Sequence, residues 1–232
     1  MTGYATVEFI LFIDPVGAII WDMRYKYIFF DLDGTLIDSY EAALATVLDT
    51  LKAHNLPLIP EDERTHGFKH VYKKHAHIVD PKKLRETHLE MQKNHFHKNT
   101  LFPQVKETLT FLKNKGVPLA LVTTGNKPKV QHLLNVLAIE NLIDVVVTES
   151  DVQNLKPHSE PFEKASQLLG ITLDQKKEIL MVGDTEVDIL GAQNFGIDVV
   201  AVTYSVYGLK VKDYNPTYMI DLFQDLLPII GV

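Results

Sequence analysis

The chain has 232 residues, of which 46% are hydrophobic and 23% are charged, as is typical of a soluble globular protein with one large or two modest domains. Its formal net charge of -7 argues against a general nucleic-acid binder, which would carry a basic stripe. The absence of cysteine excludes disulfides and thiolate chemistry and fits a cytoplasmic protein, which is the location we expect.

The N-terminal extension, residues 1–24, holds a mostly apolar stretch over residues 7–21. Acidic residues and a proline interrupt this stretch, no basic region precedes it, and its longest apolar run is too short to span a bilayer. We therefore reject a signal peptide and a transmembrane helix, and we expect no membrane partner. Two short strands around an Asp14-Pro15 turn are the simplest interpretation. A second hypothesis is that Met23 is the native start, which the N-terminal peptide of the native protein would test.

The first strand of the main fold is predicted at Tyr27–Phe30, an apolar run followed by the acids Asp31 and Asp33. Because side chains alternate along a strand, these two aspartates share a face and their carboxylates converge. Two negative charges so close repel each other unless a cation lies between them or one carries a proton. The pattern therefore predicts a chemical site, and it weighs against two residues that merely form a turn before Gly34.

A helical insertion is predicted over residues 40–98, where no strand-like run occurs and apolar residues follow helical spacing. Asp38 and Glu41 are expected to cap its first helix in a capping box. The insertion holds eight of the ten histidines, and their spacings match no specific metal site, so we expect them mainly on the solvated surface. Some of its basic residues are candidates to face an anionic substrate.

Further strands are predicted after the insertion, again from short apolar runs typical of buried parallel strands. These runs are Val117–Val122, Val145–Val147, Ile179–Val182 and Val199–Val202. Apolar spacings of three and four predict helices between them, over about 130–137, 162–169 and 189–195. Alternating strands and helices predict an α/β fold with a doubly wound parallel sheet.

The residues that end the apolar runs are the candidates for a site, because ligands bind outside the carboxyl ends of the strands in an open α/β sheet. These residues are Asp31, Asp33, Thr123, Lys156, Asp184 and Asp188. Several carboxylates can hold a hard cation through oxygen, and Mg²⁺ typically binds one or two of them while keeping water and substrate oxygens. A lysine and a hydroxyl beside such a metal suit a phosphoryl group. The sequence therefore predicts a magnesium-dependent phosphoryl site.

Four segments, in order, resemble the four sequence motifs of the haloacid dehalogenase superfamily. They read DLDGTLIDS, LALVTTGN, LKPHSEPF and VGDTEVDILGAQNFG. The resemblance spans Lys26 to about Thr203, and the insertion resembles the helical cap of the phosphoglycolate phosphatase-like branch. It implies a Rossmann-like core made of residues 25–39 and 99–232, with a helical cap at residues 40–98.

The resemblance also implies a mechanism that these residue types can support. Asp31 would attack phosphorus in line and form an aspartyl-phosphate, which splits one difficult displacement into two easier ones. Asp33 would begin protonated, donate its proton to the leaving oxygen, and then draw one from the attacking water. The metal ligands would be Asp31, Asp33 through its backbone carbonyl, and Asp184, with Asp188 supporting either the metal or Lys156.

The residues expected to bind the substrate also follow from the resemblance. They are Thr123, Thr124, Lys156, Gly34 and Thr35. Thr124 stands where many members carry asparagine, a difference that bears on contacts with the leaving group. Gly34 would let the chain turn tightly, and Thr35 would hydrogen-bond nearby backbone or the acid.

The expected function is hydrolysis of a small phosphate monoester, with phosphoglycolate as the first candidate and inorganic pyrophosphate as the alternative. Dehalogenating relatives lack the second acid, so Asp33 favours phosphate chemistry. Sugar phosphomutases tend to carry a cap histidine near the position of Ala43. The absence of this histidine here favours hydrolysis over return of the phosphoryl group, although a sugar phosphomutase stays an alternative. The remaining alternative is a phosphate-binding regulatory module without turnover.

Overall fold

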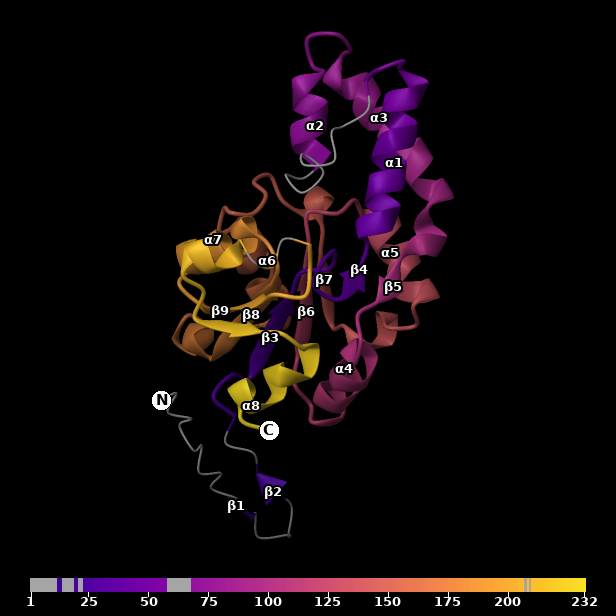
Figure 1. Cartoon of the computed structure of the whole chain (residues 1–232). Helices are drawn as coiled ribbons and strands as arrows, with labels where there is room; N and C mark the ends of the chain where they lie inside the picture. Colours follow the sequence, from indigo (N-terminus) through magenta and orange to yellow (C-terminus); the bar gives the residue numbers. More distant parts are fainter. Residues whose placement is uncertain (1–11, 14–18, 21–22, 58–67, 207, 209) are drawn as a thin grey trace, which may run out of the picture.

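The structure is a computed structural model that combines a six-stranded α/β core with a helical cap (Figure 1). It describes residues 12–13, 19–20, 23–57, 68–206, 208 and 210–232. The cap stands at one end of the core, above the carboxyl ends of the strands, as a helical insertion after the first core strand should.

The core sheet is entirely parallel, with the spatial order β10-β9-β8-β3-β6-β7. Its strands are β3 (Tyr27–Phe30), β6 (Leu119–Val122), β7 (Val145–Val147), β8 (Ile179–Gly183), β9 (Asp198–Val202) and β10 (Tyr218–Ile220). The predicted doubly wound sheet is confirmed, and β10 is an edge strand that the apolar-run pattern did not predict. Phe30 of β3 is level with Leu121 of β6 and Val182 of β8, so these three strands end together.

Helices cover both faces of the sheet because the strands are apolar on both sides. On one face Phe29 packs with Phe162 and Ile189, which belong to α6 and α7. On the other face Ile28 and Phe30 pack with residues of α4, α5 and α8. The helix bounds are α4 (Val105–Asn114), α5 (Lys127–Val136), α6 (Glu160–Leu169), α7 (Glu186–Phe195) and α8 (Leu226–Ile230). Short 3-10 turns lie at Phe96–Lys98, Glu140–Leu142, Glu149–Asp151, Asp174–Glu178, Val211–Tyr214 and Phe223–Asp225.

The cap has a small apolar core of its own. Its helices are α1 (Tyr40–Ala53), α2 (Phe68–Lys74) and α3 (Pro81–Asn94). The side chains packed between them are Val47, Leu51, Leu56, Val71 and Leu84. Two antiparallel strands, β4 (Ile37–Asp38) and β5 (Thr100–Leu101), tie the two ends of the cap to the core.

The predicted capping box at the start of α1 is wrong. Asp38 pairs with Thr100 in the β4–β5 ladder, so the N-cap position falls on Ser39, which makes no side-chain capping bond. Glu41 is then the second helical residue rather than the third that a capping box requires. Asp38 instead accepts a hydrogen bond from the backbone N–H of Tyr40, at 3.3 Å.

The N-terminal extension forms two short antiparallel strands, β1 (Phe12–Ile13) and β2 (Ile19–Ile20), as expected. The Asp14-Pro15 turn lies outside the described residues.

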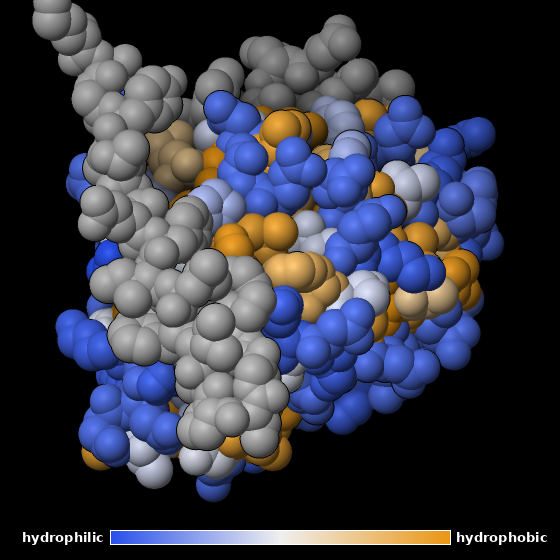
Figure 2. Space-filling view, turned by 90° about the horizontal axis from the view of Figure 1, so that it is seen from below, coloured by the Kyte–Doolittle hydropathy of each residue, from blue (hydrophilic) through white to orange (hydrophobic). Residues whose placement is uncertain are grey.

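Seen from below, the described surface carries mostly hydrophilic residues with small hydrophobic groups between them (Figure 2). No helix in the described part of the chain is long and apolar enough to cross a membrane.

Candidate active site

The site lies where β3, β6 and β8 end side by side. Asp31 follows β3, Thr123 follows β6, and Asp184 follows β8. The strand ends are tied together by their backbones, since the N–H of Asp31 donates to Val182 at 2.9 Å. All three side chains are buried, although each is polar. Burying polar groups costs free energy unless they are paired, so the packing around them must supply partners.

Lys156 supplies one such partner from the loop before α6. Its Nζ donates to Asp31 Oδ1 at 2.6 Å, to Asp188 Oδ1 at 2.5 Å and to the backbone oxygen of Val122 at 2.7 Å. These bonds use all three donors of the ammonium group. Burial alone would lower the pKa of Lys156, but the charges of Asp188 and Asp31 outweigh it and hold this pKa above its usual range. Lys156 is therefore permanently charged.

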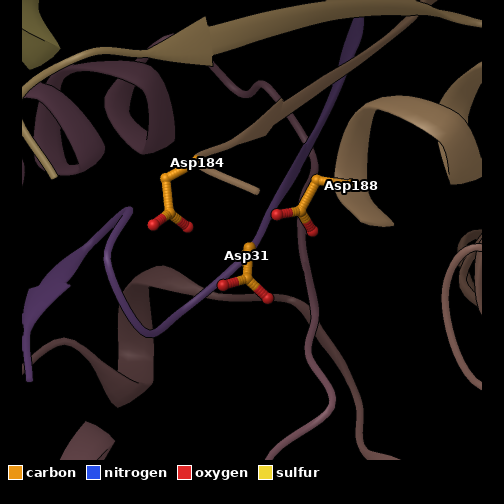
Figure 3. A group of neighbouring side chains, drawn as sticks. All are labelled: Asp31, Asp184 and Asp188. Atoms are coloured by element: carbon orange, nitrogen blue, oxygen red, sulfur yellow. The ribbon is translucent and has the colours of Figure 1, made fainter. Parts of the chain in front are cut away.

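Three carboxylates, those of Asp31, Asp184 and Asp188, converge on one point (Figure 3). One oxygen from each lies within 4.8 Å of the others. Burial raises the pKa of Asp31 to about 7, against the opposing effect of Lys156, and burial together with Asp188 and Asp31 raises the pKa of Asp184 well above its ordinary value. These two shifts indicate that Asp31 and Asp184 have less positive charge around them than their burial requires.

The donor set fits a magnesium ion. Asp184 Oδ1 accepts from the Thr35 hydroxyl at 3.2 Å, whereas the buried Asp184 Oδ2 has no partner at hydrogen-bonding distance in the described part of the chain. An unpaired buried carboxylate oxygen beside a second carboxylate is what a hard cation would bind. Asp188 uses Oδ1 on Lys156 and Oδ2 on the N–H and hydroxyl of Thr185, so in this structure it holds the lysine.

Two glycines leave the room that these carboxylates need. Gly34 has φ of +86°, and a Cβ atom there would lie 2.1 Å from Asp184 Oδ2. A Cβ at Gly183 would lie 2.4 Å from Cβ of Asp188. Both are contacts closer than real side chains make, so the positions of the Asp184 and Asp188 side chains depend on glycine at these two points.

Asp33 has a partner that the sequence analysis missed. Lys129 Nζ lies 2.7 Å from both Asp33 Oδ1 and Asp33 Oδ2. Burial would raise the pKa of Asp33, but the charge and hydrogen bonds of Lys129, with the Ser39 hydroxyl, hold this pKa below its ordinary value. Asp33 is thus ionised in this state, whereas the expectation was a protonated acid. Lys129 lies in the first turn of α5, just beyond the end of β6, and the strand-end argument could have been extended to it.

A cavity of about 420 Å³ lies between the core and the cap above these residues. Asp33, Gly34, Thr124 and Asp184 line it from the core. The other predicted substrate residues do not line it. Thr123 accepts from the N–H of Gly125 at 3.1 Å, Lys156 lies beneath Asp31, and Thr35 supports Asp184 from behind.

The cap contributes one face of α3, which the sequence analysis did not single out. The cavity-lining residues on this helix are Pro81, Arg85, His88, Leu89 and Gln92, at helical spacings of three and four. Arg85 Nη2 pairs with Glu149 of the core at 2.6 Å, and Gln92 Oε1 accepts from Asn126 Nδ2 at 3.0 Å. These contacts join the cap to the core. Arg85 is a basic cap residue that lines the cavity, so it is a candidate for the expected contact between the cap and an anionic substrate.

His88 departs from the expected surface position of the cap histidines. It is half-buried, and its Nδ1 lies 2.7 Å from the Tyr72 hydroxyl. Burial, together with the charges of Lys129 and Arg85, lowers the pKa of His88 to about 4. Its ring is therefore neutral near pH 7.

Comparisons with known proteins agree with this geometry. The family model described as Haloacid dehalogenase-like hydrolase matches residues 28–202. Pyrophosphatase PpaX of Bacillus cereus (strain B4264) is 35% identical over 223 residues, which cover 90% of this chain and 98% of that protein. Pyrophosphatase PpaX of Bacillus mycoides (strain KBAB4) is 34% identical over 227 residues, with the same coverage.

Solved structures show the same combination of core and cap. A predicted phosphoglycolate phosphatase from Haemophilus somnus 129PT superposes with a TM-score of 0.79 at 29% identity, covering 90% of this chain and 99% of that one. A hydrolase of subfamily IA, variant 1, from Geobacter sulfurreducens PCA gives a TM-score of 0.71 at 25% identity, with coverage of 90% and 98%. Each similarity covers enough of the chain to include both the core and the cap.

Proposed function

The chain belongs to the haloacid dehalogenase-like hydrolase family, and from this premise we propose that it is a magnesium-dependent phosphatase acting on inorganic pyrophosphate, with Asp31 as the nucleophile. The observation that carries the choice of substrate is the 35% identity to Pyrophosphatase PpaX over almost the whole of both chains. Sequence motifs alone placed a phosphoglycolate-like ester first and pyrophosphate second. The comparisons favour the reverse order.

The nucleophile would be the oxygen of Asp31 that Lys156 does not hold. Lys156 fixes Asp31 Oδ1 at 2.6 Å, so the orientation of the carboxylate is defined. In-line attack forms the Asp31–phosphorus bond as the bond from phosphorus to the bridging oxygen breaks, and orthophosphate leaves. Attack of water on phosphorus then releases the second orthophosphate and restores Asp31.

Magnesium would be held by Asp31 and Asp184 and by the backbone carbonyl of Asp33, where it would supply positive charge to the carboxylates and to the phosphoryl oxygens. Asp188 would serve this site through Lys156, which it contacts at 2.5 Å. Thr123 would donate a hydrogen bond to the phosphoryl group that is transferred, and Lys156 would add its positive charge and hold Asp31 in place. Positioning and electrostatics are what phosphoryl transfer chiefly requires.

The ionised state of Asp33 supports pyrophosphate over an ester. An alkoxide leaving group needs a proton as its bond to phosphorus breaks, whereas orthophosphate is a far weaker base and leaves with little help. An Asp33 that is ionised beside Lys129 can accept a proton from water in the second step. Asp33 would therefore act mainly as the base.

A phosphoglycolate-like ester is the second candidate, supported by two observations. The Haemophilus somnus structure, titled a predicted phosphoglycolate phosphatase, is 29% identical to this chain. The cavity of about 420 Å³ also has apolar lining from Leu89, Phe102 and Val206, which suits an organic leaving group.

The test is phosphate release with Mg²⁺ from pyrophosphate, phosphoglycolate and p-nitrophenyl phosphate, by wild type and by Asp31→Asn. We expect pyrophosphate to be the best substrate, and we expect the substitution to lower every rate by at least about 1,000-fold. Faster release from phosphoglycolate would favour the second candidate. No release from any of the three by the wild type, with phosphate still binding, would favour the module without turnover.

A further inference from the structure

Two cationic side chains line the cavity, whereas Lys156 does not. Lys129 comes from α5 in the core and Arg85 from α3 in the cap, and both line the cavity that also holds Asp33. Lys156 has all three ammonium hydrogens occupied beneath Asp31. It therefore has no donor left for the part of the substrate that departs.

Lys129 and Arg85 do have donors left for a ligand. The ammonium group of Lys129 has three N–H donors, and the two oxygens of Asp33 account for two of them in the described part of the chain. The guanidinium of Arg85 has five, of which Nη2 meets Glu149 at 2.6 Å. The Arg85 side chain is 57% exposed, so its remaining N–H groups are accessible from the cavity.

His88 lines the same cavity as these two cations. The charges of Lys129 and Arg85 both lower the pKa of its ring, in addition to the effect of burial. Because the ring itself is neutral near pH 7, the positive charge of these three residues comes from Lys129 and Arg85. Asn126 fixes the start of α5 by accepting from the backbone N–H of Lys129 at 3.0 Å, which places this lysine at the cavity.

We propose that Lys129 and Arg85 form a second anion-binding subsite, beside Asp33 on the leaving-group side, which selects substrates whose leaving group carries its own negative charge. For pyrophosphate this group is the second phosphate, and for phosphoglycolate it is the carboxylate. The proposal rests on the proposed phosphatase function and adds to it the residues that choose the substrate. A guanidinium can donate two parallel N–H bonds to a phosphate, and a lysine can donate a charged N–H. Both are contacts that phosphate groups favour.

The experiment must separate this role from a structural one, because removing Lys129 alone leaves Asp33 unpaired. We therefore compare Asp33→Asn with Asp33→Asn/Lys129→Gln. The probes are methylenediphosphonate, which cannot be hydrolysed and carries two phosphoryl-like groups, and orthophosphate, which carries one. Binding is measured by titration calorimetry with saturating Mg²⁺.

The second substitution should weaken methylenediphosphonate binding by about 10-fold or more while changing orthophosphate binding by less than about 3-fold. If Lys129 served only as the partner of Asp33, the two variants would bind both probes equally. Lys127→Gln is the matched control, because Lys127 is on the same helix turn but pairs with Asp151 at 3.2 Å and does not line the cavity. It should leave both affinities unchanged.

The role of Arg85 is tested by comparing its substitution with a substitution of its ion-pair partner, Glu149. Arg85→Gln should weaken methylenediphosphonate binding by about 5-fold, whereas Glu149→Gln, which frees the guanidinium, should leave it unchanged or tighter. Equal weakening by the two substitutions would show that Arg85 acts only by joining the cap to the core, and would overturn its assignment to the subsite.

The outcomes also keep this inference apart from the proposed function. Selective loss of methylenediphosphonate binding in a protein that releases no phosphate from pyrophosphate would support the subsite and refute the pyrophosphatase. Turnover of pyrophosphate with no difference between the probes in any variant would support the phosphatase and refute the subsite.

Discussion

The two walls of the cavity are built differently. The core wall, in which Asp184 lines the cavity and Asp31, Asp188 and Lys156 pack next to it without lining the cavity, consists of buried charges, and the side chain of Lys156 is only 1% exposed. The cap wall, formed by Tyr72, Arg85, His88, Leu89 and Gln92, is partly open, and the side chain of Arg85 is 57% exposed. A buried charge without its partner is expensive, whereas an exposed ion pair contributes little. Changes in the core wall should therefore affect folding and chemistry together, and changes in the cap wall should affect the choice of substrate.

The largest effect is expected in the core wall at Lys156. Lys156→Met removes the charge that pairs with Asp31 and Asp188, so it should lower activity by at least about 1,000-fold and destabilise the fold by about 3 kcal/mol. Phosphate release and guanidinium unfolding would measure the two effects. Lys127→Met, which removes an exposed lysine that pairs with Asp151, should change neither by much. More than a tenth of the wild-type activity in Lys156→Met would show that the core wall does not depend on this charge.

A substitution at Gly34, next to the core wall, should distinguish an effect on metal binding from an effect of backbone strain. Gly34→Ala places a Cβ atom 2.1 Å from Asp184 Oδ2, so it should weaken Mg²⁺ activation by about 10- to 100-fold. Gly116→Ala is the matched control, since Gly116 also has positive φ, +74°, but a Cβ there meets nothing within 4 Å. Both should lose about 1 kcal/mol of stability. Equal dependence on Mg²⁺ in the two variants would contradict the assignment of Asp184 to the metal.

Asp33 stands between the two walls and should show an intermediate effect that depends on the leaving group. Asp33→Asn should slow p-nitrophenyl phosphate and pyrophosphate about equally, through loss of the base, and should slow phosphoglycolate about 10-fold more, through loss of the acid. The comparison of kcat/KM for the three substrates measures this. Equal losses on all three would mean that Asp33 does not protonate the leaving group.

The smallest effect is expected in the cap wall, at His88. Its folded pKa of about 4 is below the ordinary 6.5, so the unfolded chain binds the proton first, and stability should fall as the pH drops from about 6.5 toward 4. Allowing for partial exposure, the loss should be on the order of 1 kcal/mol. Urea unfolding from pH 4 to pH 7 would show it, and His88→Gln should flatten this part of the profile. An unchanged slope in the variant would assign the pH dependence to other groups.

The contrast between the core wall and the cap wall also explains which features could be predicted from the sequence. Five of the six core strands, and the positions of Asp31, Thr123 and Asp184 at their ends, follow from apolar runs and from the rule that parallel strands share a carboxyl edge. Those inferences need only local patterns. The expected cap over residues 40–98 also follows, because α1, α2 and α3 replace strands there in the described part of the chain.

Other features depend on pairing and docking that a local pattern does not contain. The β4–β5 ladder decides where α1 begins, and this overrides the capping preference of Asp38. Lys129 reaches the cavity because Asn126 caps the start of α5, and Arg85 reaches it because one face of α3 lines the cavity. β10 is an edge strand of three residues with only one buried, so its apolar signal is weak.

The central claim is that Asp31 becomes phosphorylated, and the most direct measurement is to trap that intermediate. Wild type turning over pyrophosphate with Mg²⁺ would be quenched rapidly and treated with borohydride, which reduces an aspartyl-phosphate to homoserine, and the peptide containing Asp31 would be sequenced by mass spectrometry. We predict homoserine at position 31 in the wild type and none in Asp31→Asn. Modification of Asp33 instead, or pyrophosphate turnover with no modified aspartate under quench conditions that trap a known aspartyl-phosphate enzyme, would contradict the assignment.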